Sequence, residues 1–475
     1  MLPELIVVAT ALTVLVADLF LSERRRVVLA LLTLVGLAAA LAALLAAPAG
    51  SLFGGRFSVD EVAIWFKVVF LLASFLTVCL SLDQLDGRVK VRVRGIGLRG
   101  EYYAVLLSTL VGAMFLVSAR DLVTLYVSLE LATIPLFALA AWKRSDAGSQ
   151  EAGLKYVVMG ALASAFLLYG FSLLFGLAGS TDLAAIAAAV RPSPALFLAL
   201  ALVTTGIGFK LTLVPFHMWA GDVYEGAPLP VIAYLSVASK AVGLAVMFQI
   251  FYRVLGHMVK DLGPLLAFLA AATMTLGNTV AIVQRSIKRF MAFSAISQAG
   301  YIVMGFLGPD AGGVPAMLFY MLAYVAANMA VFGVIIFYAN ATGRERIEEY
   351  RGLARTNPLL ALAMMLALFS LAGIPPLSGF VGKFFLFSIA SKAGFHWLVA
   401  VAAVNSTISL YYYLRIVRQM YIEPVYPEAA RLPVTPTLAA TVAVTTVASL
   451  VLGLVPVFYE VIHNQTIEWL AKLVG

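Results

Sequence analysis

Charged residues are scarce in this chain: Asp, Glu, Lys and Arg make up 12% of its 475 residues, whereas hydrophobic residues make up 63%. Soluble domains carry roughly 25% charged and about 45–50% apolar residues. The shortage of charge therefore excludes a soluble enzyme, a nucleic-acid-binding domain and a disordered tail, and it predicts an integral membrane protein. The net charge of +8 then needs an explanation other than a polyanionic partner.

Residues that hold cofactors are equally scarce. The single cysteine, Cys79, has no partner for a disulfide and no second thiol for an iron–sulfur cluster. The four histidines are scattered, without the spacings of haem, zinc or dinucleotide sites. We therefore expect no cofactor and no metal in this chain.

Long apolar runs fill most of the sequence. Because a spanning helix needs about 20 apolar residues, the sequence predicts an all-α, polytopic membrane protein with about 14 transmembrane helices. The runs are 3–21, 27–47, 62–82, 102–119, 121–142, 152–177, 195–216, 228–253, 262–283, 288–308, 314–340, 357–391, 396–421 and 435–459. The first run lacks a basic segment before it and a cleavage site after it, so we expect a retained helix and not a removed signal peptide.

Two of these runs contain residues that no continuous helix tolerates. The run 195–216 holds two glycines and Pro215, and the run 357–391 holds Gly-Ile-Pro-Pro-Leu-Ser-Gly at 373–379. They are the seventh and twelfth runs, so each break falls in the fourth helix if spans 4–8 and 9–13 are copies. Units with an odd number of spans insert in opposite orientations, which predicts two inverted five-helix repeats with broken helices 7 and 12.

The repeats divide the sequence into four expected segments. Residues 1–100 hold three spans and a basic cytoplasmic loop, and residues 426–475 hold the last span and a tail. Residues 101–255 form the first repeat, and residues 256–425 form the second, inverted repeat.

Basic residues collect in alternate connections between the runs. One set of connections holds 20 Lys and Arg residues and the other set holds 7. Cytoplasmic loops are enriched in Lys and Arg, so the first set is predicted to be cytoplasmic and both termini to lie on the outer side. Membrane topology thus accounts for the positive net charge.

Five lysines lie inside the apolar runs, where a charge costs on the order of 2.5–3.5 kcal/mol. We expect Lys67, one turn into its span, either to snorkel outward past Trp65 or to have a function. Lys155 follows Glu151 by four residues and can form an ion pair with it, or act in transport. The other three are deep, and they indicate an ion path: Lys210, Lys240 and Lys383.

Acidic residues are rarer still inside the runs. Glu130 is the one carboxylate as deep as these lysines and is the natural counter-charge of one of them. Asp18 is nearer a helix end, where we expect a solvated or interfacial acid. The span that corresponds to that of Glu130 in the second repeat has no acid and offers Ser294, Ser297, Gln298 and Tyr301.

Buried lysines with one glutamate suit protons better than a larger solute. Burial favours neutral lysine and a nearby carboxylate favours the protonated form, so movement of charge or water near Glu130 would switch Lys210 between holding and releasing a proton. No cluster of aromatic and amide groups that would bind a sugar or peptide accompanies these lysines. We therefore interpret the deep residues as a proton relay.

Several motifs carry a resemblance to a known family. They are LYVSLEL (125–131), GFKLTLVPFHMWAGDVYEGAP (208–228), SVASK (236–240), SAISQAGY (294–301) and LAGIPPLSGFVGK (371–383). The chain resembles the antiporter-like subunits of respiratory complex I across all its spans. The DVYEGAP sequence at 222–228 is similar to the subunit N type, which has counterparts in mitochondria, as subunit 2, and in plastids, and it is unlike subunits L and M.

The resemblance implies a proton-translocating, non-redox subunit in the membrane arm of an NADH–quinone oxidoreductase. Its partners would be neighbouring antiporter-like and small membrane subunits, and flavin, iron–sulfur clusters and quinone would be bound by other chains. It implies a location in a prokaryotic cell membrane. The electron donor is set by those other chains.

The family pattern also implies roles for individual residues. Glu130 would be the charged partner of Lys210, Lys240 the central relay lysine, and Lys383 the lysine that leads to the far-side exit. His217 and Asp222 would contribute to proton entry or have a hydrogen-bonded structural role.

The chain departs from the family at one position. Relatives often have a histidine where this chain has Gln298, which does not titrate, so a path there would use water or Tyr301.

Two other functions compete with the pump. A multi-subunit Mrp-type cation/proton antiporter would share the fold and the Glu/Lys set. A membrane scaffold without transport would leave the cost of the deep Lys and Glu residues unexplained.

Overall fold

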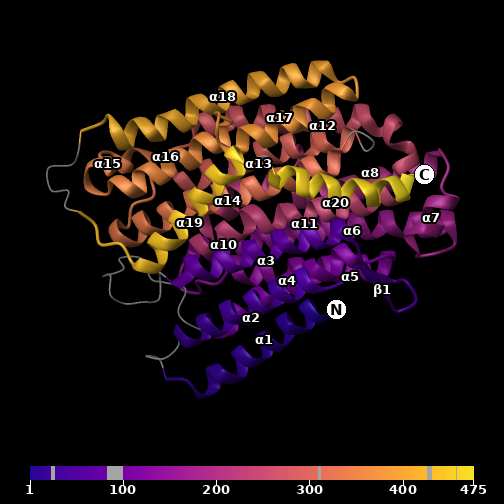
Figure 1. Ribbon diagram of the computed structural model, residues 1–475, viewed down its shortest axis with the longest axis horizontal. Helices are drawn as coiled ribbons and strands as arrows, with labels where there is room; N and C mark the ends of the chain where they lie inside the picture. The colour runs from indigo at the N-terminus through magenta and orange to yellow at the C-terminus, as the bar shows by residue number, and fades with distance from the viewer. Residues whose placement is uncertain (23–26, 83–99, 309–311, 425–430, 456, 475) are drawn as a thin grey trace.

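Helices laid side by side along one direction make up most of the chain (Figure 1). The structure is a computed structural model that describes residues 1–475 except 23–26, 83–99, 309–311, 425–430, 456 and 475. Its α-helices are α1 (Leu2–Phe20), α2 (Val27–Ala46), α3 (Glu61–Leu82), α4 (Gly100–Ser118), α5 (Leu122–Ala140), α6 (Ala147–Ala178), α7 (Leu183–Ala189), α8 (Pro194–Leu211), α9 (Trp219–Gly226), α10 (Leu229–Tyr234), α11 (Lys240–Met247), α12 (Val259–Val283), α13 (Ile287–Val303), α14 (Gly313–Thr342), α15 (Leu353–Thr356), α16 (Pro358–Ala372), α17 (Ser378–Lys392), α18 (His396–Tyr421), α19 (Pro436–Leu454) and α20 (Val457–Val474). Shorter elements are the π-helical segments η2 (Leu235–Ser239) and η3 (Phe248–Val254), the 3₁₀ turns η4 (Gly256–Met258), η5 (Met304–Leu307) and η7 (Ile347–Tyr350), and the strands β1 (Gly50–Leu52) and β2 (Phe57–Val59).

The predicted spans are present. Within the described ranges, 13 helices are long and apolar enough to cross a membrane. The remaining predicted span, the twelfth, is divided into α16 and α17, with 15 residues each. The seventh span also breaks as expected, because α8 ends at Leu211 and the short helix α9 starts only at Trp219.

The two five-helix repeats have the same order of helices. The first consists of α4, α5, α6, the α8–α9 pair and the α10–η3 span, and the second of α12, α13, α14, the α16–α17 pair and α18. Each begins with two helices packed on each other, and its third helix is the longest, with 32 residues in α6 and 30 in α14. Both breaks follow a residue with positive φ, Thr212 at 59° and Gly373 at 90°, and both contain a cis X-Pro bond.

Helix boundaries follow local sequence signals. Asp121 caps α5 by accepting hydrogen bonds from the backbone nitrogens of Val123 and Thr124. Ser193 caps α8, and Pro194 occupies the first helical position, where a missing N–H costs nothing. Glycine at positive φ ends both α6 and α14.

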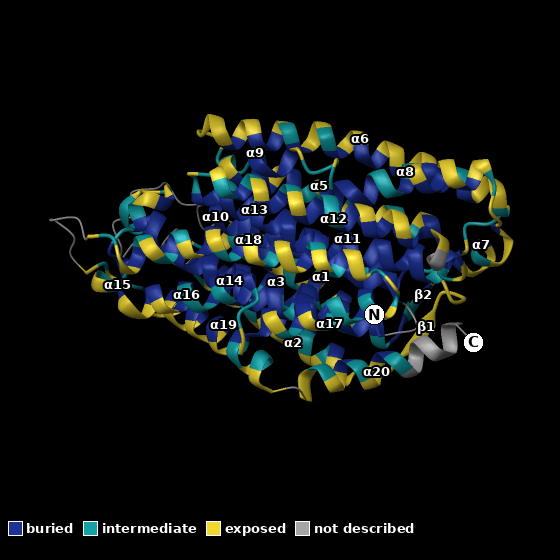
Figure 2. Ribbon diagram, turned by 90° about the horizontal axis from the view of Figure 1, so that it is seen from above, coloured by how far each residue is buried: buried dark blue, intermediate teal, exposed yellow. Residues whose placement is uncertain are grey.

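The buried centre of the bundle consists of α10, α11, α13 and α14 (Figure 2). In the eighth span, Leu229–Val254, 100% of the residues in its 18-residue apolar stretch are buried. The corresponding share is 94% for the spans of α13 and α14. Two π-helical segments, η2 and η3, interrupt this eighth span. Such segments widen a helix locally and often occur at functional sites.

Both chain ends lie toward the end of the bundle that carries β1 and α7, opposite α15 (Figure 1). This agrees with an even number of spans. Of the predicted cytoplasmic basic loops, residues 24–26 and 88–99 lie outside the described residues. Which end faces the cytoplasm stays a prediction from the charge asymmetry.

Some elements were not predicted. Strands β1 and β2 pair antiparallel, with Ser51 opposite Ser58, and form a hairpin between α2 and α3. The expected C-terminal tail is the helix α20, which packs against α14 and α3. Short amphipathic or isolated segments give weak periodic signals, and their structure comes from packing on neighbouring spans.

Of the two expectations for Lys67, outward snorkelling past Trp65 is wrong. It is fully buried, and its Nζ lies 2.7 Å from Oε1 of Glu4 on α1. Because neither side chain reaches water, the lysine finds its counter-charge on another helix.

Asp18 accepts a hydrogen bond from the backbone nitrogen of Gly100 at the start of α4, 2.9 Å away.

A second charged cluster fixes α3 to the first repeat. Asp60, just before α3, accepts hydrogen bonds from Nη2 of Arg120 at 2.7 Å and from Nη2 of Arg253. Arg120 also donates to the carbonyl of Ala119. Together with Glu4 and Lys67, these charges join the N-terminal three helices to the repeat.

We predict that Lys67→Met alone destabilises the protein by up to about 3–5 kcal/mol, because the buried Glu4 then loses its 2.7 Å partner and keeps only the N-terminal amino group of Met1, 3.6 Å from its Oε2. The double variant Glu4→Gln with Lys67→Met should recover at least half of that loss. Thermal unfolding of the detergent-extracted protein measures both. Equal losses in the single and double variants would contradict the pairing, and Arg418→Gln, an exposed residue of α18, is the control.

Candidate functional site

Lys210 lies in the last turn of α8, directly before the break. Its side chain is buried, with 3% of the residue exposed, and its Nζ has no hydrogen-bond partner in the described part of the chain. Gly206 and Gly208 allow close packing here, since a Cβ on them would collide with Leu167 and Phe216. The lysine is thus enclosed by apolar contacts while its ammonium group is unbound.

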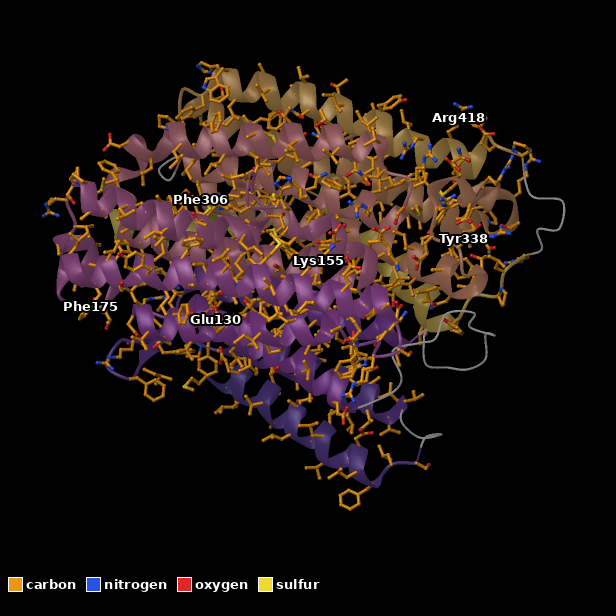
Figure 3. The ribbon with its side chains drawn as sticks, turned by 180° about the vertical axis from the view of Figure 1, so that it is seen from behind. Glu130, Lys155, Phe175, Phe306, Tyr338 and Arg418 are labelled. Atoms are coloured by element: carbon orange, nitrogen blue, oxygen red, sulfur yellow. The ribbon has the colours of Figure 1, made fainter. Side chains whose placement is uncertain are left out.

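Glu130 faces this region from α5. Its Oε1 accepts a hydrogen bond from Ser164 Oγ of α6 at 2.7 Å. Glu130 and Lys210 form no ion pair within 4.0 Å in the described part of the chain, but α6, which binds Glu130 through Ser164, packs against α8, the helix of Lys210. Figure 3 shows Glu130 among the helices of the first repeat. The predicted pair of Glu130 and Lys210 therefore lies on neighbouring parts of the bundle but is not in contact. Val127 and Leu131, beside Glu130 on α5, are exposed.

Lys240 binds the break in α8 directly. Its Nζ donates to Oγ1 of Thr212 at 3.0 Å, and Thr212 is the positive-φ residue that ends α8. The preceding residue, Ser239, donates from Oγ to the carbonyl of Lys210 at 3.3 Å. The end of η2 therefore holds both predicted lysines of the first repeat at one helix terminus.

Lys383 occupies the break of the second repeat. The last carbonyls of a helix have no partner inside it, and Lys383 Nζ donates to two of them, Leu371 at 2.9 Å and Ala372 at 3.0 Å. It also donates to Ser406 Oγ at 3.3 Å and lies 4.4 Å from the centre of the Tyr301 ring. Backbone oxygens replace the carboxylate that a buried lysine otherwise needs.

Gln298 shares an acceptor with Lys383. Its Nε2 donates to the carbonyl of Leu371 at 3.0 Å and to the hydroxyl of Tyr413 at 3.3 Å. Its Oε1 accepts from Tyr320 of α14. The structure therefore brings Gln298, Tyr301 and Lys383 together.

Sequence reasoning missed a polar stripe on α14. Tyr320, Tyr324 and Asn328 follow at intervals of four residues and so share one face. Asn328 Nδ2 donates to Ser236 Oγ in η2, and the Tyr324 hydroxyl is buried with no hydrogen-bond partner among the described residues. The spacing alone could have identified the stripe.

Lys155 and Asp222, two of the other predicted residues, form an ion pair, whereas His217 lies apart from the deep lysines. Lys155 Nζ lies 2.7 Å from Oε1 of Glu151, as the spacing predicted, and also 2.6 Å from Oδ2 of Asp222 in α9. The hydrogen bond from Lys155 is the main cause that lowers the pKa of Asp222. His217 is half-buried in the turn before α9 and, in the part of the chain that is described, makes no hydrogen bond to the deep lysines.

Metal ligands do not gather in the described ranges: no group of three or more His, Cys, Asp or Glu side chains there could hold an ion. The site consists of lysines, one glutamate and neutral hydroxyl and amide groups, arranged around two helix breaks. Such groups can hold and pass protons when water joins them.

Known proteins match most of the chain. The family described as NADH:quinone oxidoreductase/Mrp antiporter, TM matches residues 119–409. NADH-quinone oxidoreductase subunit N of Trichlorobacter lovleyi is 40% identical over 466 residues, which cover 96% of this chain and 94% of that protein. A chain of respiratory complex I from Thermus thermophilus, solved with bound aureothin, is 35% identical with a TM-score of 0.81 and coverage of 96% and 97%.

The Mrp complex of Dietzia sp. DQ12-45-1b contains a chain of the same fold. Its TM-score is 0.85, and the match covers 100% of this chain and 99% of that one. The sequence identity is 24%, so the likeness extends to the fold alone.

We predict that Thr212→Val lowers the free energy of unfolding by about 1.5–3 kcal/mol, because the Lys240 ammonium loses its acceptor. Thr212→Ser keeps the hydroxyl and should lose much less. Thermal unfolding of the two variants side by side measures the difference. If Val and Ser destabilise equally, the Lys240–Thr212 hydrogen bond contributes nothing.

Proposed function

Because the chain belongs to the family of NADH-quinone oxidoreductase subunit N, we propose that it moves protons in the membrane arm of a complex I-like assembly. Quinone reduction on other subunits drives this movement. The observation that carries the proposal is the placement of a buried lysine at each of the two helix breaks. The Mrp-type alternative shares the fold, but the full-length likeness to subunit N favours the pump.

The first repeat loads the proton. Lys210 Nζ makes no hydrogen bond within the described part of the chain, and a carboxylate such as that of Glu130 stabilises the protonated form of a lysine. When that charge is compensated by a neighbouring group or by water, Lys210 loses this stabilisation and releases its proton. Lys240, joined to the same helix end through Thr212, is the acceptor.

The second repeat discharges the proton. Lys383 is held by carbonyl and hydroxyl oxygens without a carboxylate, so no fixed negative charge traps the proton there. The lateral route from Lys240 to Lys383 follows the stripe on α14. It runs from Ser236 through Asn328, Tyr324 and Tyr320 to Gln298. Water completes this route, in which Gln298 conducts by hydrogen bonding and does not titrate.

The subunit has no redox chemistry of its own in this proposal. Its one cysteine and scattered histidines suit no electron carrier, and flavin, iron–sulfur clusters and quinone belong to partner subunits. The basic connections face the cytoplasm, and both termini face the outer side. His217 lies beside the break, at the proposed point of proton entry. Lys155 contributes to the proton path through its ion pairs with Glu151 and Asp222.

Lys210→Met tests the relay. The native assembly with this variant is reconstituted in vesicles, and proton uptake is measured together with quinone reduction. Coupled turnover should fall about tenfold or more, equivalent to ~1.4 kcal/mol or more in the barrier, because Met keeps the volume but holds no proton. Lys392→Met, an exposed lysine at the end of α17, is the matched control. Pumping that survives Lys210→Met would reject the relay and favour a scaffold.

Composition tests the assembly. Mild extraction should yield a large complex with flavin or iron–sulfur centres and quinone reductase activity. A smaller assembly of hydrophobic subunits without redox centres would instead support the Mrp-type antiporter.

Tyr320→Phe tests the lateral route, because it removes one hydroxyl group and leaves the ring. We expect proton pumping to fall about fivefold, the equivalent of one lost hydrogen bond of about 1 kcal/mol. Tyr338→Phe is the control on the same helix. The hydroxyl that it removes donates to the carbonyl of Glu349, away from the lysines. Equal pumping in the two variants would exclude the α14 stripe from the route.

A further inference from the structure

We propose that Asp222 and Arg289 form a positioning pair that links the lysine site of the first repeat to that of the second. The inference rests on the proposed function. Of the two roles predicted for Asp222, proton entry and a hydrogen-bonded structural role, this pair corresponds to the second. Its partner Arg289 was not among the predicted site residues.

Asp222 bridges the two repeats with its two oxygens. Oδ2 lies 2.6 Å from Nζ of Lys155 on α6, in the first repeat. Oδ1 lies 2.8 Å from Nη1 of Arg289 on α13, in the second repeat. The short helix α9 is therefore held from both sides by one carboxylate.

Arg289 makes a second contact with the same helix. Its Nη1 lies 2.9 Å from Oε2 of Glu225, and Lys288 donates to the carbonyl of Glu225 at 3.3 Å. Lys288 is also 2.7 Å from Oε1 of Glu345. The first turn of α13 thus binds both a side-chain and a backbone group near the end of α9.

The other end of α9 is joined to the Lys210 site. Trp219 Nε1 donates to the carbonyl of Phe209 at 3.1 Å, and Phe209 directly precedes Lys210. The Trp219 ring stacks on Tyr156 with centroids 4.5 Å apart and lies 5.2 Å from the Phe209 ring. A shift of α9 would therefore move the helix end that carries Lys210.

The far part of α13 is joined to the Lys383 site. Gln298 follows Arg289 by nine residues, or about 13 Å along the helix at 1.5 Å per residue. It donates to the carbonyl of Leu371, which Lys383 also uses. Because α13 is almost wholly buried, it moves as one body and transmits a change at Lys383 to Arg289.

The exposure of the pair fits positioning better than stability. The side chains of Asp222 and Arg289 are 38% and 31% exposed, and single ion pairs in such places contribute little to folding. What the pair does supply is geometry, because it fixes α9 relative to α13. We therefore expect its loss to affect coupling between the lysine sites more than assembly.

Double-mutant cycles in the whole reconstituted assembly test the pair. Arg289→Gln and Asp222→Asn should each lower protons pumped per quinone reduced by about twofold to thirtyfold, the range for residues that link two sites. Because Asp222 also binds Lys155 and Arg289 also binds Glu225, the double variant should lose less than the two single losses combined, since only the contact between Asp222 and Arg289 is shared. Arg289→Lys, which keeps the charge, should restore most of the loss, and Arg418→Gln, from the exposed Arg418–Glu423 pair, should pump normally.

A second cycle tests transmission along α13. Arg289→Gln and Gln298→Ala lie too far apart for direct contact, and such changes normally add. Transmission predicts that they do not add, whereas Arg418→Gln with Gln298→Ala should add.

Several results would overturn the proposal: normal pumping in Arg289→Gln, additive cycles, or loss of assembly in every variant of the pair, which would assign it to folding. Lys210→Met is measured in the same preparation. If Lys210→Met abolishes pumping and Arg289→Gln does not change it, only the positioning pair fails. If Lys210→Met pumps normally, the proposed function itself fails.

Discussion

The cost of an unpaired polar group in hydrocarbon governs this structure. Each helix break frees carbonyl groups in the middle of the bundle, and no water is available there by default to bind them. The chain resolves the two breaks differently. In the second repeat, Lys383 itself binds the freed carbonyls of α16. In the first repeat, Trp219 and Ser239 bind carbonyls at the end of α8, and the Lys210 ammonium makes no hydrogen bond to any residue that the structure describes.

This difference gives the inverted repeats unequal chemistry from similar backbones. A lysine whose ammonium is anchored by three oxygens keeps its position, while a lysine without a partner responds to any change of nearby charge. The first repeat also contains Glu130, an acid in the middle of its span, and the corresponding span of the second repeat has Gln298, which bonds to tyrosines. In the proposed route, a symmetric fold can therefore give a proton a direction, because the two ends would hold it by different means.

Charges outside the proposed relay hold the parts of the bundle together. Glu4, Lys67 and the Asp60 cluster fix the N-terminal helices to the first repeat, and Asp222 with Arg289 connects the first repeat to the second. The buried pairs are costly to break, whereas the partly exposed pair is cheap to rearrange. The same interaction type thus serves rigidity in one place and adjustable alignment in another.

Much of the fold followed from the sequence. Apolar runs of spanning length act locally, because each must leave water wherever it lies in the chain, and they predicted the spans. Glycine and proline predicted both breaks for an equally local reason. The deep residues Glu130, Lys210, Lys240 and Lys383 were also identifiable, since a charge inside an apolar run is rare at any position.

The partners of those residues were not predictable in the same way. One of the two expectations placed the Lys67 ammonium near water, but the fold brings Glu4 of α1, 63 positions away, to its Nζ. The carbonyls that hold Lys383, the stripe on α14 and the contact of Asp222 with Arg289 likewise depend on which helices touch. The sequence by itself determined which segments enter the membrane and which charges enter with them. Only the tertiary structure decided how those charges are satisfied, because that depends on distances between groups that are far apart in the chain.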